Sequence, residues 1–135
     1  MPLATTFEFH YVRQPYLPVR LTSPAWRTVL AQAVVDTGAD LSLFDDSLAD
    51  SLGIDLTNAS YVRLRGIGGE QRAYLSEVEL CPMDRPQLAV TLSIGFMQNV
   101  GANLGNLVGM DLLAVLDFGM SHANRTLYLG RSGTA

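Results

Sequence analysis

The fold is decided by one stretch, Ala33–Phe44, which reads AVVDTGADLSLF. Three apolar residues lead into an acid, a hydroxyl and a glycine, and a mostly apolar run follows after a second acid. This pattern predicts a buried strand that delivers the carboxylate of Asp36 to a tight turn and then continues as another strand.

The turn at Asp36 contains the residue types that a rigid catalytic loop needs. Gly38 lets the backbone turn without a Cβ clash, and Thr37 can form local hydrogen bonds that hold the turn. We expect the Asp36 carboxylate to be partly desolvated because it ends a buried strand. The same three residues also fit an ordinary turn between strands, so they do not identify a site alone.

Two later segments make the pattern more specific. Tyr61–Tyr74, YVRLRGIGGEQRAY, alternates around a glycine-rich centre and predicts a β-hairpin with a flexible tip. Asn106–Leu113, NLVGMDLL, places two apolar residues and a glycine before a short helix. In this order the three segments resemble those of the retropepsin family, the single-domain aspartic peptidases of retroviral type with bacterial and cellular relatives. The resemblance covers residues 15–130 and implies a closed β-barrel or sandwich with a flap hairpin.

Composition narrows the class of protein. A chain of 135 residues with 48% apolar content is expected to form one domain, residues 1–135, with one core. A formal net charge of −4 without a basic run argues against nucleic acid as a partner. All nine basic residues are arginine, which excludes lysine-dependent phosphate, Schiff-base and kinase chemistry. Asp117-Phe118-Gly119 is therefore predicted to be only a strand end and turn.

Signals for export and membrane insertion are missing from the sequence. Cys81 is the single cysteine, so no intrachain disulfide can form. The sequence does not start with a charged segment followed by an apolar one, and no apolar run approaches the ~20 residues of a spanning helix. We therefore expect a cytoplasmic protein with no membrane partner.

Alternating apolar, β-branched and aromatic residues predict an all-β fold with one or two short helices. Helices are expected at residues 45–53, capped by Asp45 or Asp46, and at residues 110–116. Strands are expected at residues 5–12, 19–22, 28–35, 41–44, 61–65, 73–80, 87–96, 107–108 and 126–129.

Peptide hydrolysis by carboxylates needs two of them. One acts as a base for water and the other as an acid for the developing oxygen, and at hydrogen-bonding distance they cannot both ionise. This chain has one Asp-Thr-Gly, and Leu107-Val108-Gly109 offers no second carboxylate. A complete pair therefore requires Asp36 from a second copy across a two-fold axis, as the resemblance also implies.

The resemblance assigns roles around the catalytic residue Asp36. Thr37, Gly38 and Ala39 would form the active-site loop of each subunit, and Thr37 would reach across the axis to brace the same loop of the other subunit. Peptide would bind by strand addition, and Ile67 at the flap tip would exclude water. The predicted substrate-binding residues are Gly38, Asp40, Arg65 and Gly66 for the peptide backbone, and Leu41, Leu43, Ile67 and Leu107 for apolar side chains, with Leu43 and Val108 equally well explained as core.

One position departs from the viral pattern. Retroviral members carry an arginine after the glycine of the last segment, and it pairs with the acid equivalent to Asp40, whereas this chain has Met110. This difference points to the bacterial and cellular relatives. Asp40 then stays free for substrate or pairs with another arginine: Arg13, Arg20 or Arg125.

A second departure concerns the pH dependence of activity. Ala39 stands where many cellular members have a serine, whose hydroxyl would stabilise the charged catalytic carboxylate. The sequence therefore predicts an optimum at weakly acidic pH.

Other chemistries find little support. Asp36 and Asp40 are spaced as in a calcium loop, but the loop glycine and the closing glutamate are missing. His10 and His122 have no ligands at zinc spacing, and Cys81 is expected to be a core residue at a strand end. No metal or cofactor is predicted.

The sequence thus predicts a homodimeric aspartic endopeptidase that acts on peptides or proteins. The alternative is a dimerisation or peptide-binding module of the same fold with little or no turnover. A third possibility is a domain cut from a larger polyprotein.

Overall fold

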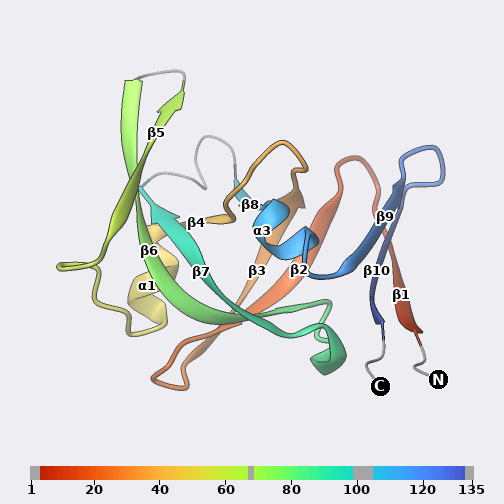
Figure 1. The fold of residues 1–135 in the computed structure, drawn as a ribbon, viewed down its shortest axis with the longest axis horizontal. Coiled ribbons are helices and arrows are strands. Elements are labelled where there is room, and N and C mark those ends of the chain that lie inside the picture. Colours follow the sequence, from red (N-terminus) through yellow and green to blue (C-terminus); the bar gives the residue numbers. More distant parts are fainter. Residues whose placement is uncertain (1–3, 67–68, 99–104, 133–135) are drawn as a thin grey trace.

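The computed structural model describes residues 4–66, 69–98 and 105–132, and it consists mainly of β-strands (Figure 1). The helical elements are short: α1 (Asp46–Ser51), α3 (Met110–Leu113) and the 3-10 helix η1 (Pro86–Leu88). The predicted all-β class is therefore confirmed. The strands are β1 (Ala4–His10), β2 (Tyr16–Thr22), β3 (Thr28–Val35), β4 (Leu43–Asp45), β5 (Tyr61–Gly66), β6 (Gly69–Pro82), β7 (Val90–Met97), β8 (Asn106–Val108), β9 (Asp117–Ser121) and β10 (Thr126–Ser132).

Strands β2-β3-β8-β4-β7-β6 form a closed barrel, because β6 pairs back with β2. Closure depends on the length of β6, which has 14 residues. Its first part pairs with β5, its middle with β7 and its last residues with β2. The β5–β6 hairpin projects from the barrel as the predicted flap would (Figure 1). Ile67, predicted at its tip, lies outside the described residues.

The core fills the barrel because alternate strand residues point inward. In β2, Leu17, Val19 and Leu21 are buried while the residues between them are more exposed. Phe44 of β4 pairs with Phe96 of β7, and both are fully buried. Burial of such a side chain contributes about 1.5–3 kcal/mol, so this pair anchors the strand that follows the Asp36 turn.

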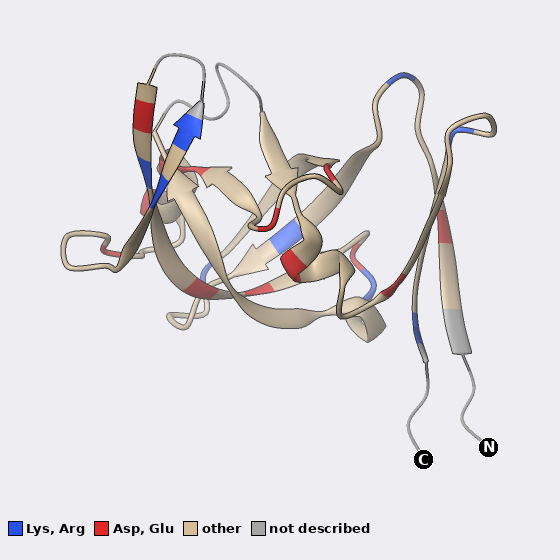
Figure 2. Cartoon of the chain, turned by 45° about the horizontal axis from the view of Figure 1, so that its top comes forward, with Lys and Arg blue, Asp and Glu red and all other residues tan. Residues whose placement is uncertain are grey.

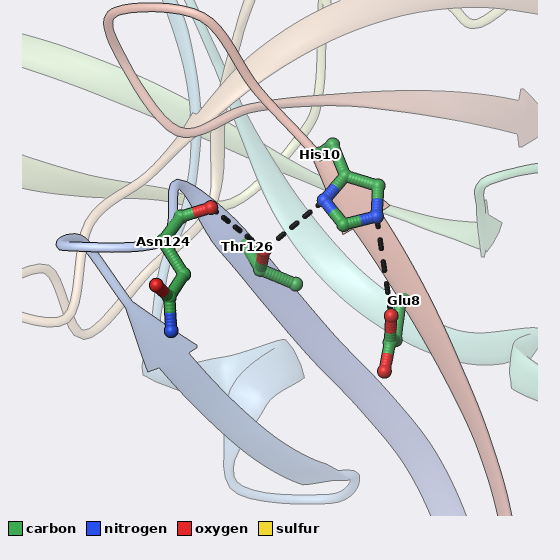
Figure 3. A network of polar contacts seen from close by, with 4 residues as sticks. All are labelled: Glu8, His10, Asn124 and Thr126. Carbon is green, nitrogen blue, oxygen red and sulfur yellow. Dashed lines mark hydrogen bonds and ion pairs between the residues drawn. The ribbon is translucent and has the colours of Figure 1, made fainter.

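The two chain ends form a separate sheet, β1-β10-β9, beside the barrel (Figure 1). The Thr126 hydroxyl donates to the Asn124 carbonyl at 2.9 Å and therefore accepts a hydrogen bond from Nδ1 of His10, at 3.0 Å (Figure 3). Nε2 of His10 lies 3.9 Å from the Glu8 carboxylate. These contacts join the end of β1 to the start of β10.

Several predicted elements differ from the structure. The strands predicted at residues 41–44 and 87–96 begin later, at Leu43 and Val90, and η1 takes up the start of the second one. Residues 117–121 form a full strand, β9, so the turn predicted at Asp117-Phe118-Gly119 comes later, at residues 122–125. Helix α3 ends at Leu113, short of residue 116, because the chain turns there to bury Leu116 and enter β9. No helix in the described part of the chain is long and apolar enough to cross a membrane.

Candidate active site

The predicted catalytic residue, Asp36, directly follows β3 and begins a tight loop. Its backbone N–H donates to the Val108 carbonyl of β8 at 2.9 Å. The Gly38 N–H donates to Oδ1 of Asp36 at 2.9 Å, and the Ala39 N–H donates to the Asp36 carbonyl at 3.2 Å. This Asx-type turn fixes one carboxylate oxygen. We call residues 36–40 the Asp36 loop.

The Asp36 loop presents its polar side chains to solvent. Asp36, Thr37 and Asp40 are exposed in the single chain. The expected partial desolvation of the Asp36 carboxylate is therefore not provided by its own chain. Three surface hollows, of about 360, 520 and 450 Å³, are formed by the described residues, and Asp36 lines none of them.

Gly109 brings the segment after β8 against the Asp36 loop. The Met110 N–H donates to the Ala39 carbonyl at 2.7 Å. A Cβ at Gly109 would lie 2.6 Å from the same carbonyl oxygen, which is too close for any side chain. Glycine at this position is therefore required by the contact between two backbones. We call residues 108–112 the Gly109 segment.

A buried network that the sequence did not predict joins these two segments. Ser42, fully buried, donates its hydroxyl to Oδ1 of Asp111 at 2.7 Å and accepts the Gly109 N–H at 3.0 Å. The Ser42 N–H donates to Oδ2 of Asp111 at 2.9 Å, and the Ser42 carbonyl accepts the Gly95 N–H at 2.9 Å. Every polar group of Ser42 is therefore paired, as burial demands.

A second cross-link ties β8 to neighbouring elements. The Asn106 side chain accepts the Asp45 N–H at 2.9 Å and donates to the Gln32 carbonyl at 3.2 Å. Asp45 is also the N-cap of α1, since its carboxylate accepts the Ser47 N–H at 3.1 Å, as one of the two predicted caps. For the network of Ser42 and Asp111, the sequence held only two signals: a serine inside the apolar run at residues 41–44 and an acid in the first turn of α3.

Asp40 has no ion-pair partner among the described residues. Of the candidate arginines, Arg20 pairs with Asp84 at 3.1 Å, and Arg125 donates to the Val12 carbonyl. Arg13 is exposed. Within one chain, Asp40 thus matches the predicted alternative in which it is free for other contacts.

The predicted apolar lining comes together as a small cluster separate from the main core. Leu43 and Leu107 are in it, and Leu41 packs against it. Val62 and Leu64 reach the cluster from the β5–β6 hairpin. Its other members are Ala73 and Met97, with Val34 and Ala39 packed alongside.

Some predicted residues fall elsewhere. Val108 belongs to the main core, where it is fully buried. Arg65 and Gly66 end β5, and the Arg65 side chain is exposed.

The other reactive side chains lie away from the Asp36 loop. His10 and His122 belong to the terminal sheet and its turn, where Nδ1 of His122 lies 2.8 Å from the Tyr11 hydroxyl. Cys81, near the end of β6, is buried as predicted, and this burial raises the pKa of its thiol. Among the described residues no cluster of three or more metal-binding side chains occurs.

Comparison with known proteins places this geometry in a family. A family model described as aspartyl protease matches residues 27–112, which include the Asp36 loop and the Gly109 segment. The chain belongs to the aspartyl protease family. No curated protein sequence matches it significantly.

Solved structures confirm the retropepsin-like fold of this aspartyl protease. The crystal structure of a retropepsin-like aspartic protease from Rickettsia conorii matches with a TM-score of 0.65 at 19% identity, covering 99% of this chain and 97% of that one. The EIAV protease complexed with the inhibitor HBY-793 matches with a TM-score of 0.58 at 16% identity, covering 78% of this chain and 90% of that one. This chain is thus a retropepsin-like aspartic endopeptidase, more similar to the bacterial structure than to the viral one.

Proposed function

We propose that the active species is a homodimer in which each chain contributes Asp36 to a catalytic pair. The observation that carries this proposal is the Asp36 carboxylate, which is held by Gly38 at 2.9 Å and yet exposed. An aspartyl protease needs a second carboxylate at hydrogen-bonding distance, and the sequence has no second Asp-Thr-Gly. A two-fold axis beside the loop would supply that group and desolvate both.

In this dimer the two Asp36 side chains share one proton. The ionised carboxylate removes a proton from a bound water, whose oxygen attacks the carbonyl carbon of the peptide bond. The protonated carboxyl gives its proton to the carbonyl oxygen. As the C–N bond of the tetrahedral intermediate breaks, the proton taken from water passes to the departing amine, and one hydroxyl of the intermediate returns its proton to the other Asp36 carboxylate, which restores the singly protonated pair. The products are a carboxylic acid and an amine.

The substrate is an extended peptide with apolar side chains near the cleaved bond. The partly buried Leu41, Val62 and Leu64, which pack against the buried Leu43 and Leu107, offer apolar surface beside Ala39 of the Asp36 loop. Main-chain contacts come from Gly38, Arg65 and Gly66 and from Asp40, in the manner of strand addition. Ile67 closes over the peptide, and Thr37 braces the loop of the partner chain.

Replacing Asp36 with asparagine tests this function. The D36N chain should cleave an unfolded protein substrate about 10³-fold or more slowly, while its melting temperature and sedimentation coefficient stay unchanged, because asparagine keeps the size of the side chain and the oxygen that accepts the Gly38 N–H. D50N, which changes an exposed acid of α1, should retain full activity. If wild type dimerises and binds peptides but D36N and wild type show the same lack of cleavage, the protein is a binding module and the proposed function is wrong.

A further inference from the structure

The β5–β6 hairpin has two faces of different chemistry. Val62, Leu64 and Ala73 point toward the apolar cluster beside the Asp36 loop. Side chains alternate across a strand, so the residues between them lie on the opposite, outward face. These residues are Tyr61, Arg63, Arg65, Glu70, Arg72 and Tyr74, which we call the arginine face.

The arginine face is basic in an acidic protein. It carries three of the nine arginines of the chain and one glutamate, whereas the whole chain has a net charge of −4. Figure 2 shows blue segments on both strands of this hairpin and one red segment on β6. A local excess of positive charge attracts an anionic partner rather than holding the fold together.

The arrangement of two of these arginines is unfavourable by itself. Arg63 and Arg72 are direct cross-strand partners on one face, and like charges placed opposite each other destabilise a sheet. Glu70 pairs with Arg63 at 3.3 Å. The Arg72 guanidinium instead lies over the Tyr61 ring, 4.5 Å from its centroid. An added carboxylate between these two guanidinium groups would relieve their repulsion.

Tyrosines frame this pair of arginines. The rings of Tyr61 and Tyr74 lie 5.7 Å apart. A hydrogen bond with Arg63 and the charge of Arg72 lower the pKa of the Tyr61 hydroxyl. The face therefore combines positive charge with flat apolar surface, a combination typical of interaction sites.

The hairpin also has an unpaired edge. β5 is the end strand of its sheet and pairs only with β6 among the described residues. A peptide added along this edge would place alternate side chains on the arginine face, beside Arg63 and Arg65. Main-chain pairing of this kind selects a peptide over other polyanions.

Arginines on an end strand also protect it from aggregation. Such protection accounts for Arg63 and Arg65, which are in β5. It does not account for Arg72, which is in the paired strand β6, or for its position opposite another arginine.

We propose that the arginine face docks an acidic, extended segment of the protein substrate, outside the segment that is cleaved. The consequence for catalysis rests on the proposed peptidase function, whereas docking itself requires no turnover. Because the face points away from the apolar cluster, an acidic segment there contributes to substrate binding and does not touch the reacting atoms. Such segments should lower KM and leave kcat unchanged.

Docking is measured first without cleavage, in the full-length D36N chain. The probe is a fluorescent twelve-residue peptide of alternating Glu and Thr, followed by anisotropy at low salt, with a peptide of alternating Gln and Thr as its control. We expect only the acidic peptide to bind. R72E should weaken its binding about tenfold, whereas R131E, with the same change of charge on the distant strand β10, should leave it unchanged. R72E should change the melting temperature little, because the lost contact with the Tyr61 ring is offset by an ion pair with Arg63 on the opposite strand.

Several results would overturn the docking proposal. One is that the D36N and D36N/R72E chains bind the acidic peptide equally well. Another is that D36N binds the Gln peptide as well as the acidic one. A third is that a single-stranded oligonucleotide of the same charge fully displaces the acidic peptide.

A cleavage assay separates this proposal from the proposed function. The same apolar substrate is fused to an acidic or to a Gln-rich segment, and wild type should show a lower KM for the acidic fusion, a difference that R72E abolishes. Cleavage of both fusions with equal KM would overturn docking and leave the peptidase intact. Binding of the acidic peptide without cleavage of either fusion would support docking and overturn the proposed peptidase function.

Discussion

The Asp36 loop and the Gly109 segment touch each other but are built in opposite ways. In the Asp36 loop, the side chains of Asp36, Thr37 and Asp40 are exposed, and the described bonds of the loop are mostly to its own backbone or to the Gly109 segment. The Gly109 segment is buried in the core at Val108 and Leu112. It is held to the barrel through the hydrogen bonds of Ser42 and Asp111.

This difference shows that the reactive group and the rigidity of the site come from different parts of the chain. Changes in the Gly109 segment should therefore affect both stability and activity. Changes in the exposed Asp36 loop should affect activity alone. Four substitutions test this separation, beginning with the one expected to have the largest effect.

G109A should have the largest effect. The added methyl group would lie 2.6 Å from the Ala39 carbonyl oxygen, and backbone cannot move aside cheaply. We expect a loss of about 1–3 kcal/mol in unfolding free energy and a strong loss of activity, measured by urea unfolding and cleavage. G119A is the control, because its methyl group would lie 3.7 Å from Tyr128 at ordinary contact distance. Equal stability of the two variants would contradict the close contact.

S42A should rank second. It leaves the Gly109 N–H and one oxygen of Asp111 without the buried hydroxyl that pairs with both. An unsatisfied buried polar group costs about 1–3 kcal/mol, and the looser Asp36 loop should reduce kcat. S47A removes an exposed hydroxyl from the cap of α1 and should change stability by about 0.5 kcal/mol or less. If S42A lowered stability but left kcat unchanged, the network would brace only the core.

D40N should change binding and leave the fold intact. Asp40 is exposed and unpaired among the described residues, so D40N should change the unfolding free energy of the protein by about 0.5 kcal/mol or less. A role in holding substrate predicts a KM raised about three- to tenfold with little change in kcat. Steady-state kinetics with a peptide substrate and thermal unfolding measure the two effects. A large fall in melting temperature would reveal a structural partner of Asp40.

A39S should have the smallest effect, a shift in pH profile. A serine hydroxyl beside the catalytic pair would stabilise its charged form, so the acid limb of kcat/KM should move down by about one pH unit or less. Wild type should be most active at weakly acidic pH, and both chains should have the same unfolding free energy. A shift of the acid limb to higher pH would contradict this assignment.

Much of the fold could be predicted from the sequence because its signals are local. Strand β3 was predicted at its observed bounds, since its apolar residues run directly into the Asp36 turn. The hairpin of β5 and β6 was predicted from alternation around glycines. These features depend on residues close together in the chain.

The bracing network could not be predicted in this way. Ser42 and Asp111 are 69 positions apart, and only the barrel brings them together. A serine in an apolar run and an acid at a helix start each have simpler explanations. Strand β9 was missed for a similar reason, because Gly119 is typical of a turn and its place in the sheet depends on pairing with β10.

Mixing two forms of the chain tests the central claim most directly. If each active site needs Asp36 from two chains that exchange at random, adding an equal amount of D36N to wild type should lower activity to about half, and a ninefold excess to about one tenth. Cleavage is measured after equilibration at a concentration where the dimer prevails. Activity that stays constant at every ratio would mean that one chain suffices, and would contradict the shared catalytic pair.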